Sequence, residues 1–410
     1  PQKGVDSFKG VSFKLKRHLD FLPFYSALKI GGEFRIQDRD IVAHQEDRTF
    51  NGINGSTNAS LFRDDSYSDA YNGFGFRNIE WPSPYEAWEA YQADPSLFTM
   101  TPGQELAARR FYLQNSQYVE ERVSAAFIQH ELKAIDNRLN VTYGVRYEKT
   151  EDEGRGLKIT GPSSSMALLE ANWTERGQQV TKGYDGYYPS INANFTVTED
   201  LVVRGGYAKT FGRPNFINII PLTRVNDTTS PENDGIGNIN ADTVLVRNTG
   251  LKPWRADNYD VTIEYYLPKA GLAAIRGFVK DLTGFFVTVD RPLTDADIAE
   301  FNLENIDPAA LARGMTLQTS FNSSEPARLS GYEVTYRIAT VPWIPSSFGN
   351  FGFFASYTNQ RTTGPGQVNF TFFAPELANA RLNYSKGRFQ AAIGVNYTSR
   401  RLVGLLGSGT

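Results

Sequence analysis

The feature that most constrains this chain is an alternation of apolar and polar residues with a period of two. Tyr259, Val261, Ile263 and Tyr265 are apolar, whereas the residues between them are polar. Successive side chains of a β-strand point to opposite faces, so this pattern predicts a strand with one apolar and one polar face. The same alternation recurs at 141–148, 332–338 and 389–397. It predicts an all-β protein.

Twelve segments of this kind are predicted as strands. Most are 8 to 14 residues long, whereas a strand of a globular protein averages about 5–6 residues. A strand that crosses a bilayer at a tilt needs about 9–11 residues. The predicted strands are 9–18, 26–38, 120–133, 138–150, 187–197, 201–211, 257–267, 272–282, 329–339, 351–361, 377–384 and 389–400.

The connections between these segments alternate between short and long. The short ones lie near 19–25, 134–137, 198–200, 268–271, 340–350 and 385–388. The long ones lie near 39–119, 151–186, 212–256, 283–328 and 362–376. An antiparallel meander with all its long loops at one end is typical of an outer-membrane β-barrel, which has short periplasmic turns and long extracellular loops. A soluble sandwich has no reason for this asymmetry.

The polar faces and the strand ends support the same interpretation. Aromatic residues at strand ends, such as Tyr147, Phe211 and Tyr397, suit the interface of a membrane. Charges of both signs on the other face predict a polar lumen, although alternation alone would also fit a soluble sandwich. These inward charges are Lys14, Lys16, Glu33, Arg35, Arg146, Glu148, Arg204, Glu264 and Arg337.

The long loops carry features of their own. Short helices are predicted at 84–91, 104–112, 294–301 and 307–314, the last with Asp307 as N-cap, Pro308 at the first helical position and Gly314 as the stop. Trp81, Tyr85, Trp88 and Tyr91 form an aromatic group in the longest loop. Exposed aromatic faces commonly bind ligands or partners, so these four are the candidate ligand-binding residues. The alternative is that they form a small core of the loop itself.

Composition excludes several classes of protein. The 410 residues include no cysteine, which excludes a disulfide scaffold, a cysteine-ligated metal site and a thiol enzyme. A net charge of -3 without a basic block argues against a nucleic-acid partner. The three histidines have no metal-ligand spacing, and no catalytic motif is present. We therefore expect no catalytic residues, metal site or cofactor, and a protein that is not an enzyme.

Several short motifs in a fixed order resemble a known family. These are Tyr188 to Asn192, Thr198 to Thr210, Gly212 to Phe216 and Asn248 to Pro253, followed by Phe278 to Leu282 and Leu329 to Glu333. Together they resemble the barrel of TonB-dependent outer-membrane receptors. The resemblance covers about 120–400, and the earlier strands more weakly. In that family the Asn…Leu-Lys-Pro element at 248–253 leads from an extracellular loop into the next strand.

The resemblance implies a transmembrane β-barrel in a bacterial outer membrane. Its partners would be outer-membrane lipid and, through a plug domain not found in this chain, the TonB complex. The function implied is uptake of a scarce ligand such as a siderophore, cobalamin or an oligosaccharide. We expect 1–410 to be a single barrel domain, a fragment without the plug and the terminal strands. The alternatives are a passive porin-like channel, which twelve strands could form by closing on themselves, and an all-β binding protein.

Overall fold

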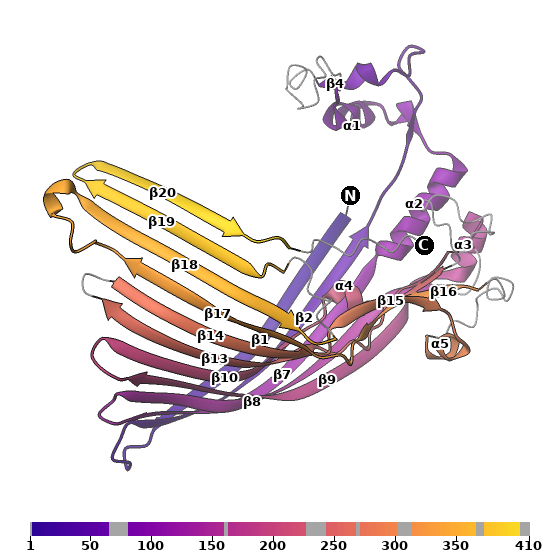
Figure 1. Ribbon diagram of the computed structural model, residues 1–410. Coiled ribbons are helices and arrows are strands. Elements are labelled where there is room, and N and C mark those ends of the chain that lie inside the picture. Colours follow the sequence, from indigo (N-terminus) through magenta and orange to yellow (C-terminus); the bar gives the residue numbers. More distant parts are fainter. Residues whose placement is uncertain are drawn as a thin grey trace.

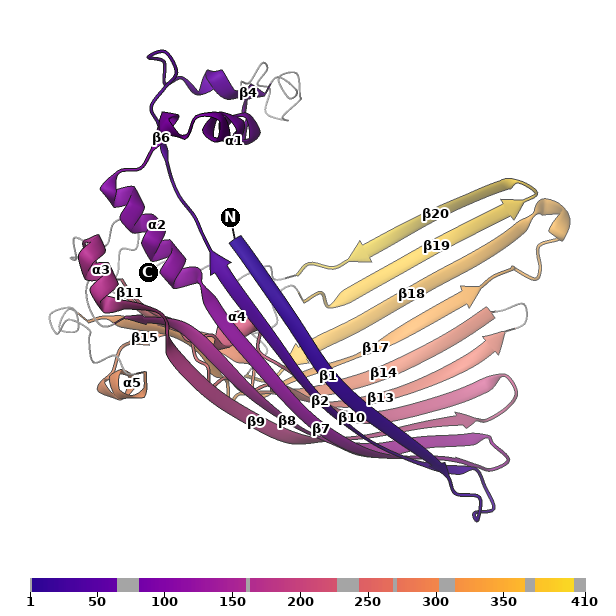
Figure 2. The ribbon, with the colours of Figure 1, turned by 180° about the vertical axis from the view of Figure 1, so that it is seen from behind.

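The computed structural model is dominated by one antiparallel sheet of twelve strands that follow one another in chain order. It describes residues 2–64, 81–159, 163–226, 243–267, 271–301, 314–365 and 373–401. The sheet is curved into a wall, with the helices and long connections at one end and the short turns at the other (Figures 1 and 2). We call these the loop end and the turn end.

The strands of the wall are listed here in chain order, each paired with the next. They are β1 (Gln2–His18), β2 (Ser26–Ala43), β7 (Gln117–Ala134), β8 (Leu139–Ile159), β9 (Trp173–Thr196), β10 (Leu201–Gly212), β13 (Trp254–Leu267), β14 (Gly271–Thr283), β17 (Ala327–Ile338), β18 (Asn350–Thr363), β19 (Glu376–Lys386) and β20 (Phe389–Thr398).

The register explains why the two faces differ. Residues directly opposite one another on paired antiparallel strands point to the same side of the sheet. One row across the outer face is entirely apolar: Val203, Ile263, Ile275, Val334, Tyr357, Ala378 and Tyr397. A neighbouring row on the inner face is mostly polar: Val202, Glu264, Ala274, Thr335, Ser356, Asn379 and Asn396.

The apolar outer face is largely uncovered. Val261, Ile263 and Tyr265 expose about half of their surface, and Ile393 is 72% exposed. An apolar belt of this size suits contact with lipid, because a monomeric soluble protein rarely exposes a large contiguous apolar patch. None of the helices in the described part of the chain is long and apolar enough to span a membrane.

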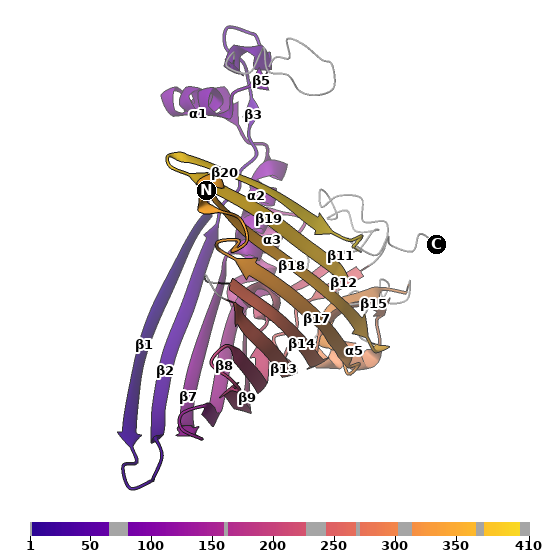
Figure 3. The same cartoon turned by 60° about the vertical axis from the view of Figure 1, so that its left-hand side comes forward.

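The wall is open in the part of the chain that the structure describes. β1 pairs only with β2, and β20 pairs only with β19. The two strands lie at opposite edges of the sheet (Figure 3). The twelve strands therefore do not close on one another as a small pore would require.

The two sides of the wall differ in height. β7, β8 and β9 have 18, 21 and 24 residues, whereas β17 to β20 have 10 to 14. We call β7–β9 the tall side and β17–β20 the short side. The extra length lies at the loop end, so the tall strands continue beyond the level at which the short ones stop (Figure 1).

The long connections contain the remaining elements. The first holds β3 (Thr49–Phe50), η1 (Ala59–Phe62), β4 (Arg63–Asp64), β5 (Trp81–Pro82), α1 (Pro84–Ala93), η3 (Pro95–Leu97), β6 (Phe98–Thr99) and α2 (Pro102–Asn115). The later ones hold α3 (Met166–Asn172), α4 (Phe216–Ile219), β11 (Thr223–Asn226), β12 (Thr243–Val246), β15 (Phe286–Pro292), α5 (Asp295–Glu300) and β16 (Thr316–Asn322), and η4 (Ser346–Phe348) lies in a connection at the turn end.

All twelve predicted strands are confirmed, as is the alternation of short and long connections. The predicted helices at 84–91, 104–112 and 294–301 are confirmed as α1, α2 and α5. The helix predicted at 307–314 and the turn at 268–270 lie outside the described residues. The expected long loop at 151–186 is wrong for most of its length, since β8 continues to Ile159 and β9 begins at Trp173.

Candidate functional site

The longest connection folds into a small unit at the loop end, which we call the loop head (44–64 and 81–101). It stands away from the wall on two adjacent segments (Figures 1 and 2). Phe50, Phe62 and Phe98 form its centre, with ring centroids 4.9 to 6.2 Å apart. The two segments pair through β3 and β6, where Phe50 lies opposite Phe98. An aromatic core of this kind keeps the loop head folded although it touches little of the wall.

The four aromatic residues predicted to bind a ligand lie together in the loop head but differ in exposure. Tyr91 packs edge-on against Phe98 at 5.8 Å, and Arg48 stacks over its ring at 5.0 Å. It therefore belongs to the core of the loop head. Trp88 contacts Tyr91 at 5.5 Å but remains 57% exposed, and Trp81 and Tyr85 are 45% and 67% exposed.

Helix α1 determines how these rings are presented. Ser83 caps it by accepting a hydrogen bond from the amide of Glu86, and Pro84 occupies the first turn. No residue of α1 is buried. Tyr85 and Trp88 are three positions apart and so lie near one face of the helix. A hydrogen bond with Glu89 raises the pKa of the exposed Tyr85 hydroxyl.

Helix α2 connects the loop head to the tall side. Its first turn carries a capping box in which Thr101 and Gln104 bond each other's backbone amide. Leu106 and Leu113 of α2 are buried against Leu157 of β8 and Leu169 of α3. The loop end of the tall strands thus provides a hydrophobic surface against which α2 and α3 pack.

Two long connections that are far apart in sequence form a second sheet, which the sequence analysis missed. β11 and β12 come from 213–253, β15 and β16 come from 284–326, and β12 pairs in parallel with β16. Val244, Val246, Met315 and Leu317 form the buried hydrophobic cluster of this loop sheet. The only sequence signal was the apolar run Thr243-Val244-Leu245-Val246, which is too short to be distinguished from an ordinary loop segment.

Asn322 joins the two connections where each meets the wall. Its side chain accepts a hydrogen bond from the amide of Lys252 at 2.8 Å and donates to the carbonyls of Lys252 and Gly284. Asn248 donates to the carbonyl of Ser320 at 3.0 Å. The element at 248–253 therefore leads into β13 at Trp254, as the resemblance implied, and is also bonded to the second loop.

The segment after β10 does not extend outward but lies on the inner face of the tall side. The buried Ile219 and Ile220 pack with Val119 of β7 and Leu251. Pro221 lies so close to Gly154 and Gly156 that a Cβ at Gly156 would stand 1.7 Å from its carbonyl oxygen. Only glycine leaves room for this contact.

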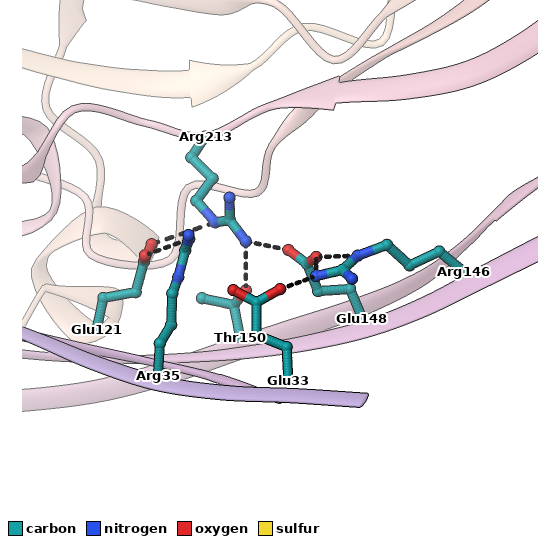
Figure 4. A network of polar contacts seen from close by, with 7 residues as sticks. All are labelled: Glu33, Arg35, Glu121, Arg146, Glu148, Thr150 and Arg213. Carbon is teal, nitrogen blue, oxygen red and sulfur yellow. Dashed lines mark hydrogen bonds and ion pairs between the residues drawn. The ribbon is translucent and has the colours of Figure 1, made fainter. Parts of the chain in front are cut away.

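Arg213 holds this segment through an ion-pair network (Figure 4). Its guanidinium lies between the carboxylates of Glu121 and Glu148, with Nε 3.2 Å from Glu121 Oε2. Both carboxylates are nearly buried, with side chains 6% and 7% exposed. Arg35 contacts the other oxygen of Glu121 at 3.2 Å. Arg146 bridges Glu148 at 2.7 Å and Glu33 at 3.1 Å.

Asp152 lies one step further along β8, beside this network. It is 3% exposed, and its Oδ1 has no hydrogen-bond partner among the described residues. Burial, reinforced by the nearby charge of Glu121, raises the pKa of Asp152 to about 7, although Arg213 opposes the shift. Its neighbours Glu151 and Glu153 point to the outer face and are charged, so this level lies beyond the apolar belt. The hydroxyl of Tyr184 is also buried, and burial raises its pKa.

A hollow of the inner surface lies elsewhere, on the short side. A depression of about 690 Å³ is lined by residues of β17 to β20, among them Arg337, Phe354 and Arg381. It is open and contains none of the four predicted aromatic residues. No group of three or more His, Asp or Glu that could hold a metal occurs within the described ranges.

The chain is similar to one protein family and to several solved structures. A family model described as the TonB-dependent receptor-like β-barrel matches residues 4–408. A mutant of the ferric enterobactin receptor from Pseudomonas aeruginosa, in complex with enterobactin, has a TM-score of 0.53 at 13% identity over 98% of this chain and 42% of that one. No curated protein matches the chain.

Two other solved structures give the same result. The alcaligin outer-membrane receptor FauA from Bordetella pertussis has a TM-score of 0.52 at 11% identity, over 97% of this chain and 47% of that one. The ferric-catecholate import receptor Fiu from K12 E. coli has a TM-score of 0.52 at 12% identity, over 99% and 46%. At such identities the likeness shows the fold alone. The chain spans less than half the length of each of these structures.

Proposed function

The chain belongs to the family of TonB-dependent receptor-like β-barrels, and on this premise we propose that it forms part of the wall of an outer-membrane receptor that imports a scarce ligand. The observation that carries the proposal is the division of the wall into an apolar outer face and a charged inner face, with every long loop at one end. Lipid would cover the outer face. Residues 1–410 would act as one barrel domain.

Energy for uptake would come from TonB acting on a plug domain in the lumen. The described residues form no such plug. The ligand would be an iron–siderophore complex, cobalamin or an oligosaccharide. The similar solved structures bind enterobactin or are named as receptors for alcaligin and ferric catecholates, and these ligands are properties of those proteins. A passive porin-like channel is less well supported, because β1 and β20 do not pair.

We propose that the loop head captures the ligand through Trp81, Tyr85 and Trp88, with Tyr91 supporting them from the core. Exposed rings on a folded unit offer large contact area at small cost in conformational entropy, since each has few rotatable bonds. The short turns offer no comparable surface, which is why recognition is assigned to the loop end.

The test is uptake by the intact receptor in a receptor-deleted strain, with and without TonB. A panel of ferric siderophores, cobalamin and oligosaccharides serves as the set of ligands. One of them is expected to accumulate only when TonB is present. Deleting 81–91 should abolish binding of that ligand and leave the amount of folded barrel in the membrane unchanged. Uptake that is indifferent to TonB would instead favour a passive channel.

A further inference from the structure

The connection between β17 and β18 differs from the other connections at the turn end (Figure 1). It runs over 339–349, whereas the others in the described part of the chain are 19–25, 135–138, 197–200 and 387–388. A hairpin loop usually needs only about 2–5 residues. Each of the shorter connections carries a charged residue, whereas no charge occurs between Arg337 and Arg361. We call 339–349 the apolar turn.

The apolar turn exposes its two largest side chains. Trp343 is 73% exposed and Phe348 is 65% exposed. Large rings that remain in water forgo the stabilisation that burial of apolar surface brings. A turn that only joined two strands would have no use for such rings, because tight turns are built from small and polar residues. Trp343 and Phe348 therefore indicate a contact with a surface outside this chain.

The backbone of the apolar turn leaves few hydrogen-bond donors without an acceptor. Two of its residues are prolines, Pro342 and Pro345, which have no amide hydrogen. Four further amides donate to backbone carbonyl oxygens, namely those of Val341, Ile344, Phe348 and Gly349. An amide without a partner is costly in an apolar environment. This pattern of bonded and missing donors suits a turn that lies partly out of water.

The strands that flank the apolar turn are apolar on their outer face up to the turn itself. Ile338 lies opposite Phe353, which lies opposite Leu382. Phe353 is four residues from Tyr357 of the apolar outer row, so it faces the same way. The apolar outer face therefore reaches the turn end of β17 and β18 without a charged border.

An aromatic group joins the apolar turn to this outer face. The ring of Phe351 is 4.8 Å from that of Tyr384, which is 5.9 Å from the ring of Phe389. Gly349, the last residue of the apolar turn, has a φ of +99°, and a Cβ there would lie 2.7 Å from Cε2 of Tyr384. Glycine thus lets the turn close onto Tyr384, which faces outward because it is two residues from Leu382. The outer face and the apolar turn form one continuous surface.

The two flanking strands are short of apolar length, and the apolar turn can supply it. Outward residues are apolar over 332–338 in β17 and over 351–357 in β18. Six residue steps of a strand span about 20 Å, and a tilt of about 40° reduces this to about 15 Å along the membrane normal. The apolar band of a membrane barrel is about 25 Å tall. Because the polar Ser330 and Asn359 border these runs at the loop end, only the turn end can extend them.

We propose that the apolar turn binds the lipid surface at the turn end of the wall, with Trp343 and Phe348 at the level of the head groups. The inference rests on the proposed function, because it requires lipid on the outer face. A tryptophan ring suits this position, since its body is apolar and its N–H can bond a head group. A protein interface is normally surrounded by a polar rim, and the apolar turn has no charged residue that would contribute to one.

A spin label measures the depth of the apolar turn in the intact receptor, reconstituted in phosphatidylcholine vesicles. None of the 410 residues is a cysteine, so Phe348→Cys adds a single labelling site to this part of the receptor. The control is Asp200→Cys, at an exposed residue of the tight turn 197–200 at the same end of the wall. The ratio of accessibility to oxygen over accessibility to a water-soluble nickel complex should be at least fivefold higher at Phe348. Equal ratios at the two sites would overturn the proposal.

The fluorescence of Trp343 provides a second measurement. Its contribution is the difference between the wild type and Trp343→Phe, a variant that keeps an aromatic ring in the apolar turn. This contribution should fall at least twofold in vesicles of brominated lipid, because bromine quenches tryptophans that lie in lipid. The contribution of Trp88, obtained in the same way from Trp88→Phe in the loop head, should not change. A contribution of Trp343 that brominated lipid leaves unchanged would overturn the proposal.

A partner protein is the competing occupant. If the label at Phe348 is accessible to water in vesicles but protected in outer membranes isolated from cells, a protein covers the apolar turn and the lipid assignment is wrong. A second copy of the receptor is distinguished by dilution, since contact with lipid is independent of the lipid-to-protein ratio. Neither measurement depends on transport. A receptor that takes up its ligand through TonB while the label stays in water would keep the proposed function and refute this inference alone.

Discussion

Arg213 and Arg381 both lie on the inner surface of the wall, but their surroundings differ. On the tall side Arg213 is enclosed by two nearly buried carboxylates, and the chain itself covers the strands through Ile219, Ile220 and Pro221. On the short side Arg381 is exposed, and every residue of the neighbouring β20 is exposed. On the tall side the charged groups around Arg213 pair with one another, whereas on the short side the side chain of Arg381 bonds the amide oxygen of Asn383.

Replacing the central cation of the tall side should have the largest effect. Arg213→Ala leaves Glu121 and Glu148 nearly buried without the charge between them, and such a loss typically costs about 3–5 kcal/mol. We expect the segment 213–222 to lose its protection, measured by hydrogen exchange of its backbone amides. Arg328→Ala removes an exposed pair with Asp281 and should cost less than about 1 kcal/mol. If Arg213→Ala and Arg328→Ala lowered the stability by similar amounts, the distinction between the tall side and the short side would be wrong.

The segment 213–222 docks on the inner face of the tall side, beside the buried carboxyl group of Asp152. This carboxyl group should make the docking depend on pH. The pKa of Asp152 is about 7 when the segment is docked and near its ordinary value, about 4, when water reaches it. A raised pKa means that docking is favoured by protonation, so docking weakens as pH rises from about 4 to 7. The slope is about 1.4 kcal/mol per pH unit within that window. Proteolysis of the segment, measured from pH 5 to 8, should show this trend.

Asp152→Asn supplies the control for that trend. The amide stays neutral at every pH, so the docked segment should remain equally protected from pH 5 to 8. A trend that persists in Asp152→Asn would assign the titration to another group.

If the outer face of the wall contacts lipid, a charge introduced on that face at mid-height should lower the stability of the wall. Ile263 faces outward and is 45% exposed in the absence of lipid. Ile263→Arg should cost about 2–4 kcal/mol, because an arginine on the lipid face near the bilayer midplane is unfavourable. Thr335→Arg, on the inner face between Ala274 and Ser356, should cost much less. Urea unfolding of the receptor in lipid vesicles measures both, and equal costs would refute the facing assignment.

Substitutions in the loop head should have smaller effects. They should distinguish residues that bind the ligand from residues that pack in the core of the loop head. Trp88→Ala and Tyr85→Ala should each weaken ligand binding about tenfold without unfolding the loop head, since both side chains are exposed. Tyr91→Ala should loosen the aromatic core around Phe98 and thereby reduce the thermal stability of the loop head. If ligand binding survives the loss of both Tyr85 and Trp88, the aromatic group serves only as the core of the loop head.

The sequence predicts the wall well because lipid and lumen impose opposite demands on alternate residues. All twelve strands follow from that alternation. The prediction ends too early on β8, where Glu151, Asp152 and Glu153 resemble a solvated loop. Above the bilayer both faces of a strand can carry charge, so period two loses its signal although the backbone remains paired with Lys182 and its neighbours.

The candidate site was predicted less completely than the wall. The aromatic group was found because four large rings within eleven residues are conspicuous, but sequence could not show that Tyr91 is part of a core while Tyr85 is exposed. The inward fold of 213–222 depends on contacts with Glu121, Glu148 and Gly156, which are distant in sequence. No local pattern encodes such contacts, and only the register of the wall brings them together.

The parallel pairing of β12 with β16 has a consequence for how the loops of this receptor can vary. Each of these strands supplies core residues that pack against the other loop. Val244 of β12, for example, lies directly opposite Leu317 of β16. An insertion in one connection would therefore have to preserve a register set by the other, and the two would be inherited as a pair. Exchange of either loop alone between related receptors should produce a misfolded surface, whereas transfer of 213–253 together with 284–326 moves a complete module. For the construction of chimeric receptors, the two loops are a single unit of exchange.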